Sequence, residues 1–161
     1  MKKRTKNLVL GALVAALYVV MTILASALGL SSQVIQVRFS EALTILPVFT
    51  PAAIPGLFIG CMIANYITGC VIWDILFGSV ATLIGAVGTY LFRKNKYLAV
   101  LPPILSNTIA VPFILKYAYQ LEDAMWFMFI TVGAGELISV GILGLLLHQA
   151  IEKTKISGIF E

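Results

Sequence analysis

The residues best suited to chemistry in this sequence are acidic and amide side chains that stand inside long apolar runs. Glu136 is the clearest case, because it lies about 18 Å into the apolar run 124–149 if that run is a helix. A carboxylate at this depth in a bilayer costs at least about 2.5–3.5 kcal/mol to insert, so it normally faces a cavity or a partner. The sequence places no basic residue within the membrane to neutralise it. Glu136 therefore predicts a polar cavity inside a membrane protein.

Four further polar side chains are expected near the same cavity: Asn107, Asn65, Asp74 and Glu41. Each of the last three has a structural alternative. Asp74 is suited to capping the helix that it opens, and Glu41 to pairing with the neighbouring Arg38. Asn65 is equally suited to a hydrogen bond between helices. The sequence leaves these alternatives open.

Signatures of catalysis are absent from the sequence, which has no nucleophile elbow, no H-E-x-x-H and no phosphate-binding loop. The two cysteines, Cys61 and Cys70, do not have the spacing of metal ligands. The one histidine, His148, is predicted to be an interfacial residue at the end of its helix. We therefore expect a binding protein without catalytic residues, metal or cofactor, and any ATP hydrolysis linked to its work must come from other chains.

The elements that must position these residues are membrane helices. Of 161 residues, 60% are hydrophobic and 11% charged, against roughly 45–50% and 25% in soluble domains. We expect an all-α membrane protein, a bundle of six transmembrane helices that forms one domain over residues 1–161. The predicted helices cover residues 8–28, 41–50, 53–69, 74–92, 97–117 and 124–149.

The second predicted helix is too short to cross a bilayer alone. We interpret the second and third helices as a tight pair joined by a turn that contains Pro51 and Pro55. How deep this pair lies in the protein stays open.

Basic residues form three clusters, at residues 2–6, 93–96 and 153–155. With six spans all three clusters fall on one face, which the positive-inside rule makes the cytoplasm, so both termini are predicted to be cytoplasmic. The clusters also explain the net charge of +4 without a nucleic-acid partner. An alternative is that the first run is a secretory signal with a cleavage site at Ala25-Ser26-Ala27, although its length favours a retained helix.

Two further features suit contacts with a partner or a ligand. Gly11, Ala12, Ala15 and Ala16 form a strip of small residues that lets another helix approach closely. The strip predicts a partner-docking face, with packing against the protein's own helices as the alternative. Residues 31–39 alternate between polar and apolar types, which indicates an extended stretch that is either a lid over a ligand or an ordinary connection.

Several of these segments resemble one known family. The segments are RFSEALT at 38–44, PAAIPGLFIGCMIAN at 51–65, WDILFGSVATL at 73–83, LPPILSN at 101–107, and Gly135-Glu136. They resemble the queuosine-precursor transporter (QueT) family, whose members are substrate-binding subunits (S components) of energy-coupling factor (ECF) transporters. The resemblance spans nearly the whole chain.

The resemblance implies a six-helix subunit in the bacterial cell membrane that captures a queuosine precursor, a 7-deazaguanine, from outside. It implies partners for ATP-driven uptake, namely an ECF transmembrane coupling subunit and two cytoplasmic ATPase subunits. It also implies that the small-residue strip docks onto the coupling subunit and that residues 31–39 close over the ligand.

The chemistry of a 7-deazaguanine suits the polar residues. Glu136 and Asn107 carry groups that complement a guanine-like edge, and Asp74 or Glu41 would pair with the amine of an aminomethyl-bearing precursor. An aromatic side chain is expected to stack on the ring. The predicted substrate-binding residues are Glu136, Asn107, Asp74, Glu41, Asn65, Arg38, Phe39, Trp73, Tyr117 and Trp126.

Three other functions are consistent with the sequence. The same scaffold would suit another vitamin-like heterocycle. A small intramembrane enzyme would use Glu136 or Asp74 as a general acid or base, but the sequence shows no second catalytic group to accompany it. A purely structural protein would leave Glu136 facing no cavity.

Overall fold

The structure, a computed structural model, describes residues 3–30 and 35–154, and every regular element in these residues is helical. Two of the elements are π-helical (η3 and η4) and one is a 3-10 helix (η2). The elements are α1 (Lys3–Ala27), η2 (Phe39–Val48), α2 (Ala53–Ile67), η3 (Asp74–Gly78), α3 (Ser79–Leu91), α4 (Lys96–Ala99), α5 (Leu101–Tyr117), α6 (Met125–Glu136), η4 (Leu137–Gly144) and α7 (Leu145–Lys153).

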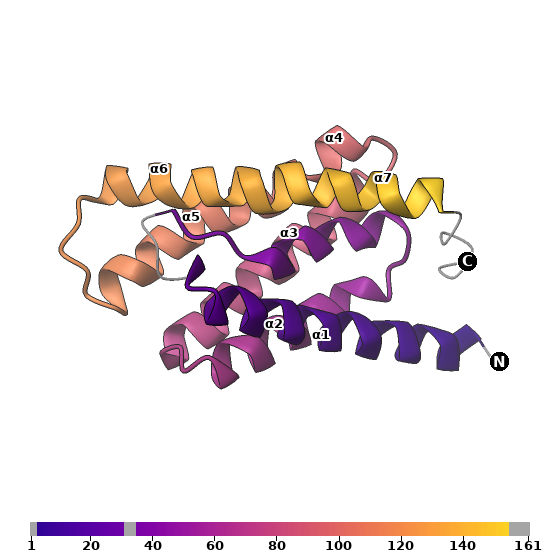
Figure 1. The fold of residues 1–161 in the computed structure, drawn as a ribbon, viewed down its shortest axis with the longest axis horizontal. Helices are drawn as coiled ribbons and strands as arrows, with labels where there is room; N and C mark the ends of the chain where they lie inside the picture. The colour runs from indigo at the N-terminus through magenta and orange to yellow at the C-terminus, as the bar shows by residue number, and fades with distance from the viewer. Residues whose placement is uncertain (1–2, 31–34, 155–161) are drawn as a thin grey trace.

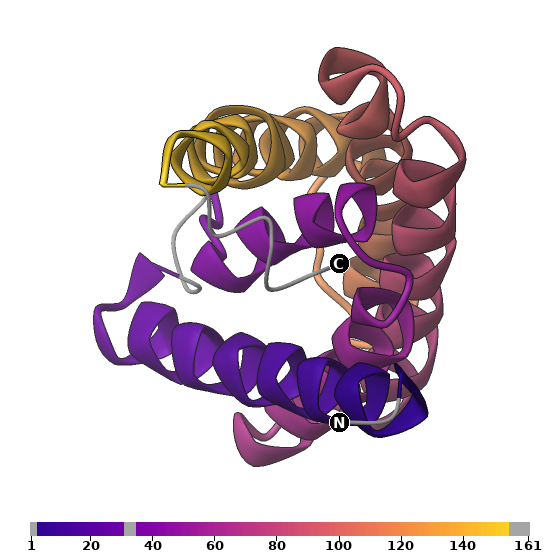
Figure 2. The same ribbon diagram turned by 90° about the vertical axis from the view of Figure 1, so that its right-hand side faces the viewer.

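The longer helices surround η2, which lies at the centre of the bundle (Figures 1 and 2). The elements α6, η4 and α7 follow one another without a break and form a single C-terminal rod along one side (Figure 1). Helix α1 packs on α2, α3 packs on α5, and η2 contacts both α1 and the rod. All residues from Ser40 to Pro47 are buried, so η2 is an interior element.

Four helical segments are long and apolar enough to cross a membrane: Lys3–Ala27, Asp74–Leu91, Lys96–Tyr117 and Met125–Lys153. Only 33–44% of the residues in their most apolar windows are buried, so most of their surface faces outward. Exposed leucine, isoleucine, valine and phenylalanine side chains cover these outer faces. A surface this apolar is suited to lipid rather than water. The chain is therefore a multi-pass membrane protein.

The prediction for residues 41–50 and 53–69 is corrected in its details. The first segment is a 3-10 helix from Phe39 to Val48, and the second is an α-helix from Ala53 to Ile67. Both are shorter than the 18 residues that define the four long segments. A turn that contains Pro51 does separate them, whereas Pro55 lies inside α2. Helix η2 is buried within the protein, while α2 keeps an exposed face.

The basic clusters lie at one end of the bundle. Helix α1 begins and α7 ends there (Figure 1), and the Lys96 ammonium of α4 lies 3.8 Å from the Glu152 carboxylate of α7. Lys2 and Lys155, which the sequence also placed in these clusters, lie outside the described residues. The common location agrees with the expected arrangement of the charges.

His148 lies near the end of the C-terminal rod, as the sequence predicted, but its side chain does not face outward. It is buried, and its ring lies 4.9 Å from the ring of Phe49, measured between centroids. Its Nδ1 is 3.3 Å from the exposed carboxylate of Glu152. His148 therefore packs α7 against the end of η2.

The strip of small residues on α1 is divided between two environments. Gly11 and Ala15 lie against Gly56 and Gly60 of α2, where the backbones approach closely enough that a Cβ at residue 56 would be 2.5 Å from the Gly11 carbonyl oxygen. Ala12 and Ala16 are exposed, and all four residues line an apolar groove of about 1030 Å³ along the outside of α1 and α2. Gly11 and Ala15 therefore pack against α2, while Ala12 and Ala16 remain open to a partner.

The contact between α1 and α2 predicts that Gly56→Ala destabilises the protein. The new methyl group meets backbone, which cannot move aside as a flexible side chain would, so we expect a loss of about 1–3 kcal/mol. The measurement is the midpoint of thermal unfolding in detergent. Gly141→Ala is the matched control, because its Cβ would meet only Ile104 Cδ1, at 3.8 Å. Equal midpoints for the two variants would contradict the proposed close packing.

Helix η2 is held to α1 by buried polar side chains. The Tyr18 hydroxyl donates a hydrogen bond to Glu41 Oε1, and the Thr22 hydroxyl donates to Ser40 Oγ at 2.8 Å. Glu41 is 2% exposed and Tyr18 1% exposed, so water cannot replace either partner. These bonds fix the position of Glu41 at the centre of the bundle.

This arrangement predicts that Tyr18→Phe destabilises the protein by about 1–3 kcal/mol, because it leaves Glu41 Oε1 buried without its donor. Chemical or thermal unfolding in detergent measures the change. Tyr66→Phe is the control, because Tyr66 is exposed and loses only a solvated hydroxyl. If Tyr18→Phe proved as stable as Tyr66→Phe, the Tyr18 hydroxyl would not support Glu41.

Candidate functional site

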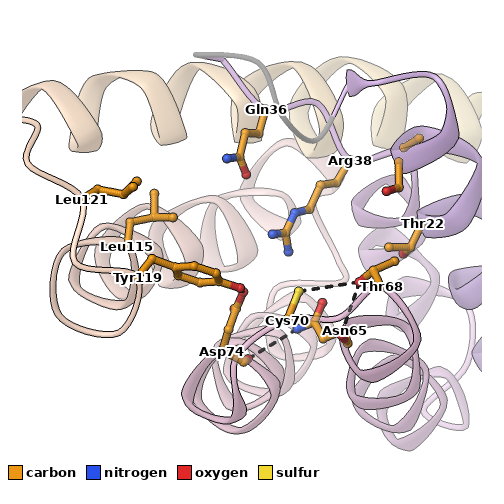
Figure 3. Close-up of a pocket in the computed structure, with 12 residues that line it drawn as sticks. Thr22, Gln36, Arg38, Asn65, Thr68, Cys70, Asp74, Leu115, Tyr119 and Leu121 are labelled. Atoms are coloured by element: carbon orange, nitrogen blue, oxygen red, sulfur yellow. Dashed lines mark hydrogen bonds between the residues drawn. The ribbon is translucent and has the colours of Figure 1, made fainter.

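A polar cavity, called here the outer cavity, lies at the end of the bundle opposite the basic clusters. Its volume is about 340 Å³, within the roughly 300–1,000 Å³ typical of small-molecule sites. The last turns of α1 and the segment that follows α5 form its walls. Figure 3 shows side chains from several elements converging on it. The lining residues are Thr22, Ala25, Ser26, Gln36, Arg38, Asn65, Thr68, Cys70, Asp74, Leu115, Tyr119 and Leu121.

A second, much smaller cavity, called here the inner chamber, adjoins the outer cavity. Its volume is about 20 Å³, which is room for about one water molecule or for the edge of a ligand. Gln36 and Arg38 line both spaces and so form the boundary between them. The remaining lining residues are Glu41, Cys61, Gly78, Thr82, Asn107, Val111, Val132 and Glu136.

The three carboxylates of these cavities stand where the chain departs from α-helical geometry. Glu41 lies in the ten-residue 3-10 helix η2, Asp74 is the first residue of the π-helix η3, and Glu136 directly precedes the π-helix η4. Runs of 3-10 helix this long are uncommon, and π-helical turns occur frequently at functional sites. The irregular geometry therefore marks the same three residues that the sequence selected by their charge.

Glu136 and Asn107 line the inner chamber together, but they differ in their partners. The Asn107 Nδ2 donates to Glu41 Oε2 at 3.2 Å. Glu136 is 8% exposed, and its Oε2 has no hydrogen-bond partner among the described residues. A buried carboxylate oxygen without a donor is costly in an empty protein. Glu136 thus offers a free acceptor to whatever enters the chamber, while Asn107 orients Glu41.

Asp74 belongs to the outer cavity and does not cap its helix. The Tyr119 hydroxyl donates to Asp74 Oδ2 at 2.9 Å, and the Asn65 amide donates to the Asp74 backbone carbonyl at 3.4 Å. Burial, and then the neighbouring Cys70 and Asp74, raise the pKa of Tyr119 above its ordinary value, so its hydroxyl stays protonated as a donor. Asn65 makes the interhelical bond that the sequence allowed and also lines the cavity.

Residues 35–38 lie across the C-terminal rod. The Arg38 backbone N–H donates to Ser139 Oγ at 3.1 Å, and a Cβ at Gly135 would collide with the Gln36 carbonyl oxygen, so glycine is needed beside Glu136. Within the described residues the Arg38 guanidinium makes no ion pair closer than 4 Å, and the expected pairing with Glu41 is not formed. Residues 31–34 of the predicted lid lie outside the described residues.

The aromatic residues expected to stack on a ligand are not brought to the site. None of the described residues that line the two cavities is Phe39, Trp73, Tyr117 or Trp126. Trp73 and Tyr117 are more than half exposed and face an apolar groove on the outside of the bundle, and Trp126 is exposed as well. Tryptophan and tyrosine commonly anchor helices at the membrane interface, which explains these positions.

The sequence reasoning missed Tyr18 and Tyr119, and it included Gln36 only as part of the predicted lid, residues 31–39. For Tyr18 a signal was present, because Tyr18, Thr22 and Ser26 repeat every four residues and form a polar stripe on an otherwise apolar helix. Thr22 and Ser26 of that stripe line the outer cavity. No comparable pattern marks Tyr119, which stands in an irregular segment.

Comparison with known proteins identifies the family. The chain is 35% identical over 96 residues to the queuosine precursor transporter QueT of Lactococcus lactis subsp. cremoris (strain MG1363), and this match covers 59% of the chain and 56% of that protein's length. No solved structure matches the chain. The family model described as QueT transporter matches residues 8–153, nearly the whole chain. The chain therefore belongs to the QueT transporter family, which consists of transporters and not enzymes.

Proposed function

We propose that this chain is the substrate-binding (S) subunit of an ECF-type importer and that it captures a queuosine precursor of the 7-deazaguanine type for ATP-driven uptake. The observation that carries the proposal is the free Oε2 of Glu136, buried in a polar chamber that continues into an outer cavity. Membership of a transporter family and the similarity to a queuosine precursor transporter of Lactococcus lactis support the choice of substrate.

The chemistry of the chamber suits one edge of a 7-deazaguanine. That edge presents a ring N–H and an exocyclic amine side by side, and a carboxylate accepts such a pair of hydrogen bonds well. Glu136 has the free acceptor for this contact. The ring carbonyl beside the same edge needs a donor, and the guanidinium of Arg38 lines the same chamber. The ligand edge would supply the hydrogen-bond donor that Glu136 Oε2 lacks among the described residues.

Transport requires energy that this sequence has no motif to obtain, because it contains no phosphate-binding loop. We therefore infer that a transmembrane coupling subunit and two cytoplasmic ATPase subunits complete the importer in the bacterial cell membrane. The exposed half of the small-residue strip, Ala12 and Ala16 in the groove beside α2, is the proposed docking face for the coupling subunit.

The proposed orientation places the basic end of the bundle, and with it both termini, in the cytoplasm. The outer cavity lies at the other end, so a ligand from outside would reach it directly. In this orientation six helical segments, including the interior η2 and the short α2, form the single substrate-binding domain.

Another vitamin-like heterocycle is the alternative ligand for the same scaffold. A panel of flat heterocycles in a thermal-shift assay separates the two, because a ligand that binds the folded state stabilises it by RT ln(1 + [L]/Kd). Mass identification of the molecule released from the purified protein provides an independent answer.

We predict that Glu136→Gln weakens the binding of a 7-deazaguanine by about ten-fold or more, because the amide group offers a donor where the ligand needs an acceptor. Asn107→Ala should also weaken binding, since it releases Glu41 from its position. Isothermal titration calorimetry in detergent measures both effects. Glu122→Gln, an exposed carboxylate, is the control. Parent-like affinity in both site variants would exclude the proposed recognition of the base.

We predict that Ala16→Leu impairs assembly with the coupling subunit and leaves ligand binding intact, because leucine fills the groove on α1 far from the polar cavities. Co-purification with the coupling subunit and the ATPases measures assembly, and calorimetry measures binding. Ala150→Leu, at an exposed position on α7, is the matched control. Normal assembly of the Ala16 variant would mean that the docking face lies elsewhere.

A further inference from the structure

The charged side chains of the two cavities do not balance. Among the described lining residues there are three carboxylates and one guanidinium: Glu41, Asp74, Glu136 and Arg38. All three carboxylates are at least nine-tenths buried. Buried charge without a counter-ion is expensive, so a site with this composition is completed either by protonation of a carboxyl group or by a ligand that brings positive charge.

The three carboxylates differ in their hydrogen-bond partners and in the cavity that they face. Both oxygens of Glu41 accept hydrogen bonds, from Tyr18 and from Asn107. Glu136 faces the inner chamber, which is too small for more than the edge of a ring. Asp74 lines the wide outer cavity, and the hydroxyl of Tyr119 holds its Oδ2. Asp74 is therefore the carboxylate placed to meet a substituent that projects from the ring.

Arg38 restricts where a positive group can sit. Its guanidinium projects into the outer cavity toward the side of Tyr119 and Asp74 (Figure 3). Like charges repel, so a cationic substituent must contact Asp74 on the side of that carboxylate that faces away from the guanidinium. The guanidinium itself offers donors to a ring carbonyl. The three groups thus define an order of contacts along the ligand, from Glu136 through Arg38 to Asp74.

We propose that the site selects a 7-deazaguanine that carries a protonated amine on its five-membered ring, with the base edge on Glu136 in the inner chamber and the ammonium group on Asp74 in the outer cavity. This inference rests on the proposed function and decides between charged and neutral precursors. A precursor with a neutral nitrile at the same ring position lacks the ammonium group and makes no ionic contact with Asp74.

The experiment titrates the parent protein in detergent with 7-aminomethyl-7-deazaguanine and, separately, with 7-cyano-7-deazaguanine. We expect the amine to bind about ten- to a hundred-fold more tightly, the range for a hydrogen bond to a charged group. Asp74→Asn should weaken binding of the amine more than that of the nitrile and so narrow the ratio. Glu136→Gln should weaken both bases alike and preserve the ratio. Glu122→Gln, exposed on the same side of the bundle, should leave both affinities unchanged.

The ratio of the two affinities in the parent protein needs no variant, so the test survives if Asp74→Asn fails to fold. Equal binding of amine and nitrile by the parent would overturn the inference and leave the proposed function standing. An Asp74→Asn protein that keeps the full ratio would overturn the role of Asp74. Binding of neither base by the folded parent would overturn the proposed function and this inference with it.

Discussion

A carboxylate that stands among membrane helices must be hidden from lipid, and this protein hides three in one interior region. Glu41, Asp74 and Glu136 come from separate parts of the chain, yet all line two adjoining cavities. The outer faces of the long helices are apolar, while hydroxyl and amide side chains gather inside. Apolar side chains also pack the interior, as they do in a soluble protein. The interior holds the polar groups because the surroundings cannot solvate them.

The long spans and several site residues were predictable from the sequence, because a polar side chain inside an apolar membrane helix is costly. The four long spans follow from apolar runs that charges delimit, and their boundaries agree with the structure within a few residues, apart from α1 and α7, whose basic ends extend their helices. The same argument identified Glu136, Asn107 and Asp74, since polar side chains inside such runs normally face a cavity or a polar partner. The family resemblance agreed with these residues and is confirmed.

The sequence did not predict features that depend on tertiary contacts. Nothing in residues 39–48 distinguishes a 3-10 helix from an α-helix, because the choice follows from its enclosure by α1 and the C-terminal rod. The aromatic side chains were misleading for a related reason, since tryptophan and tyrosine suit both a ligand and the membrane interface. The partner of Asn107 was also beyond reach, because Glu41 lies 66 positions away in the chain.

The enclosure of η2 has a consequence for biosynthesis. At about 2.0 Å per residue its ten residues span roughly 20 Å, short of the roughly 30 Å of hydrocarbon, and it carries a glutamate. Such a segment has no stable resting state in lipid by itself. The residues that cover it include the C-terminal rod, which the ribosome makes after η2. The polar interior therefore closes only once the rod has been made, and a chain truncated before the rod would leave Glu41 without that cover.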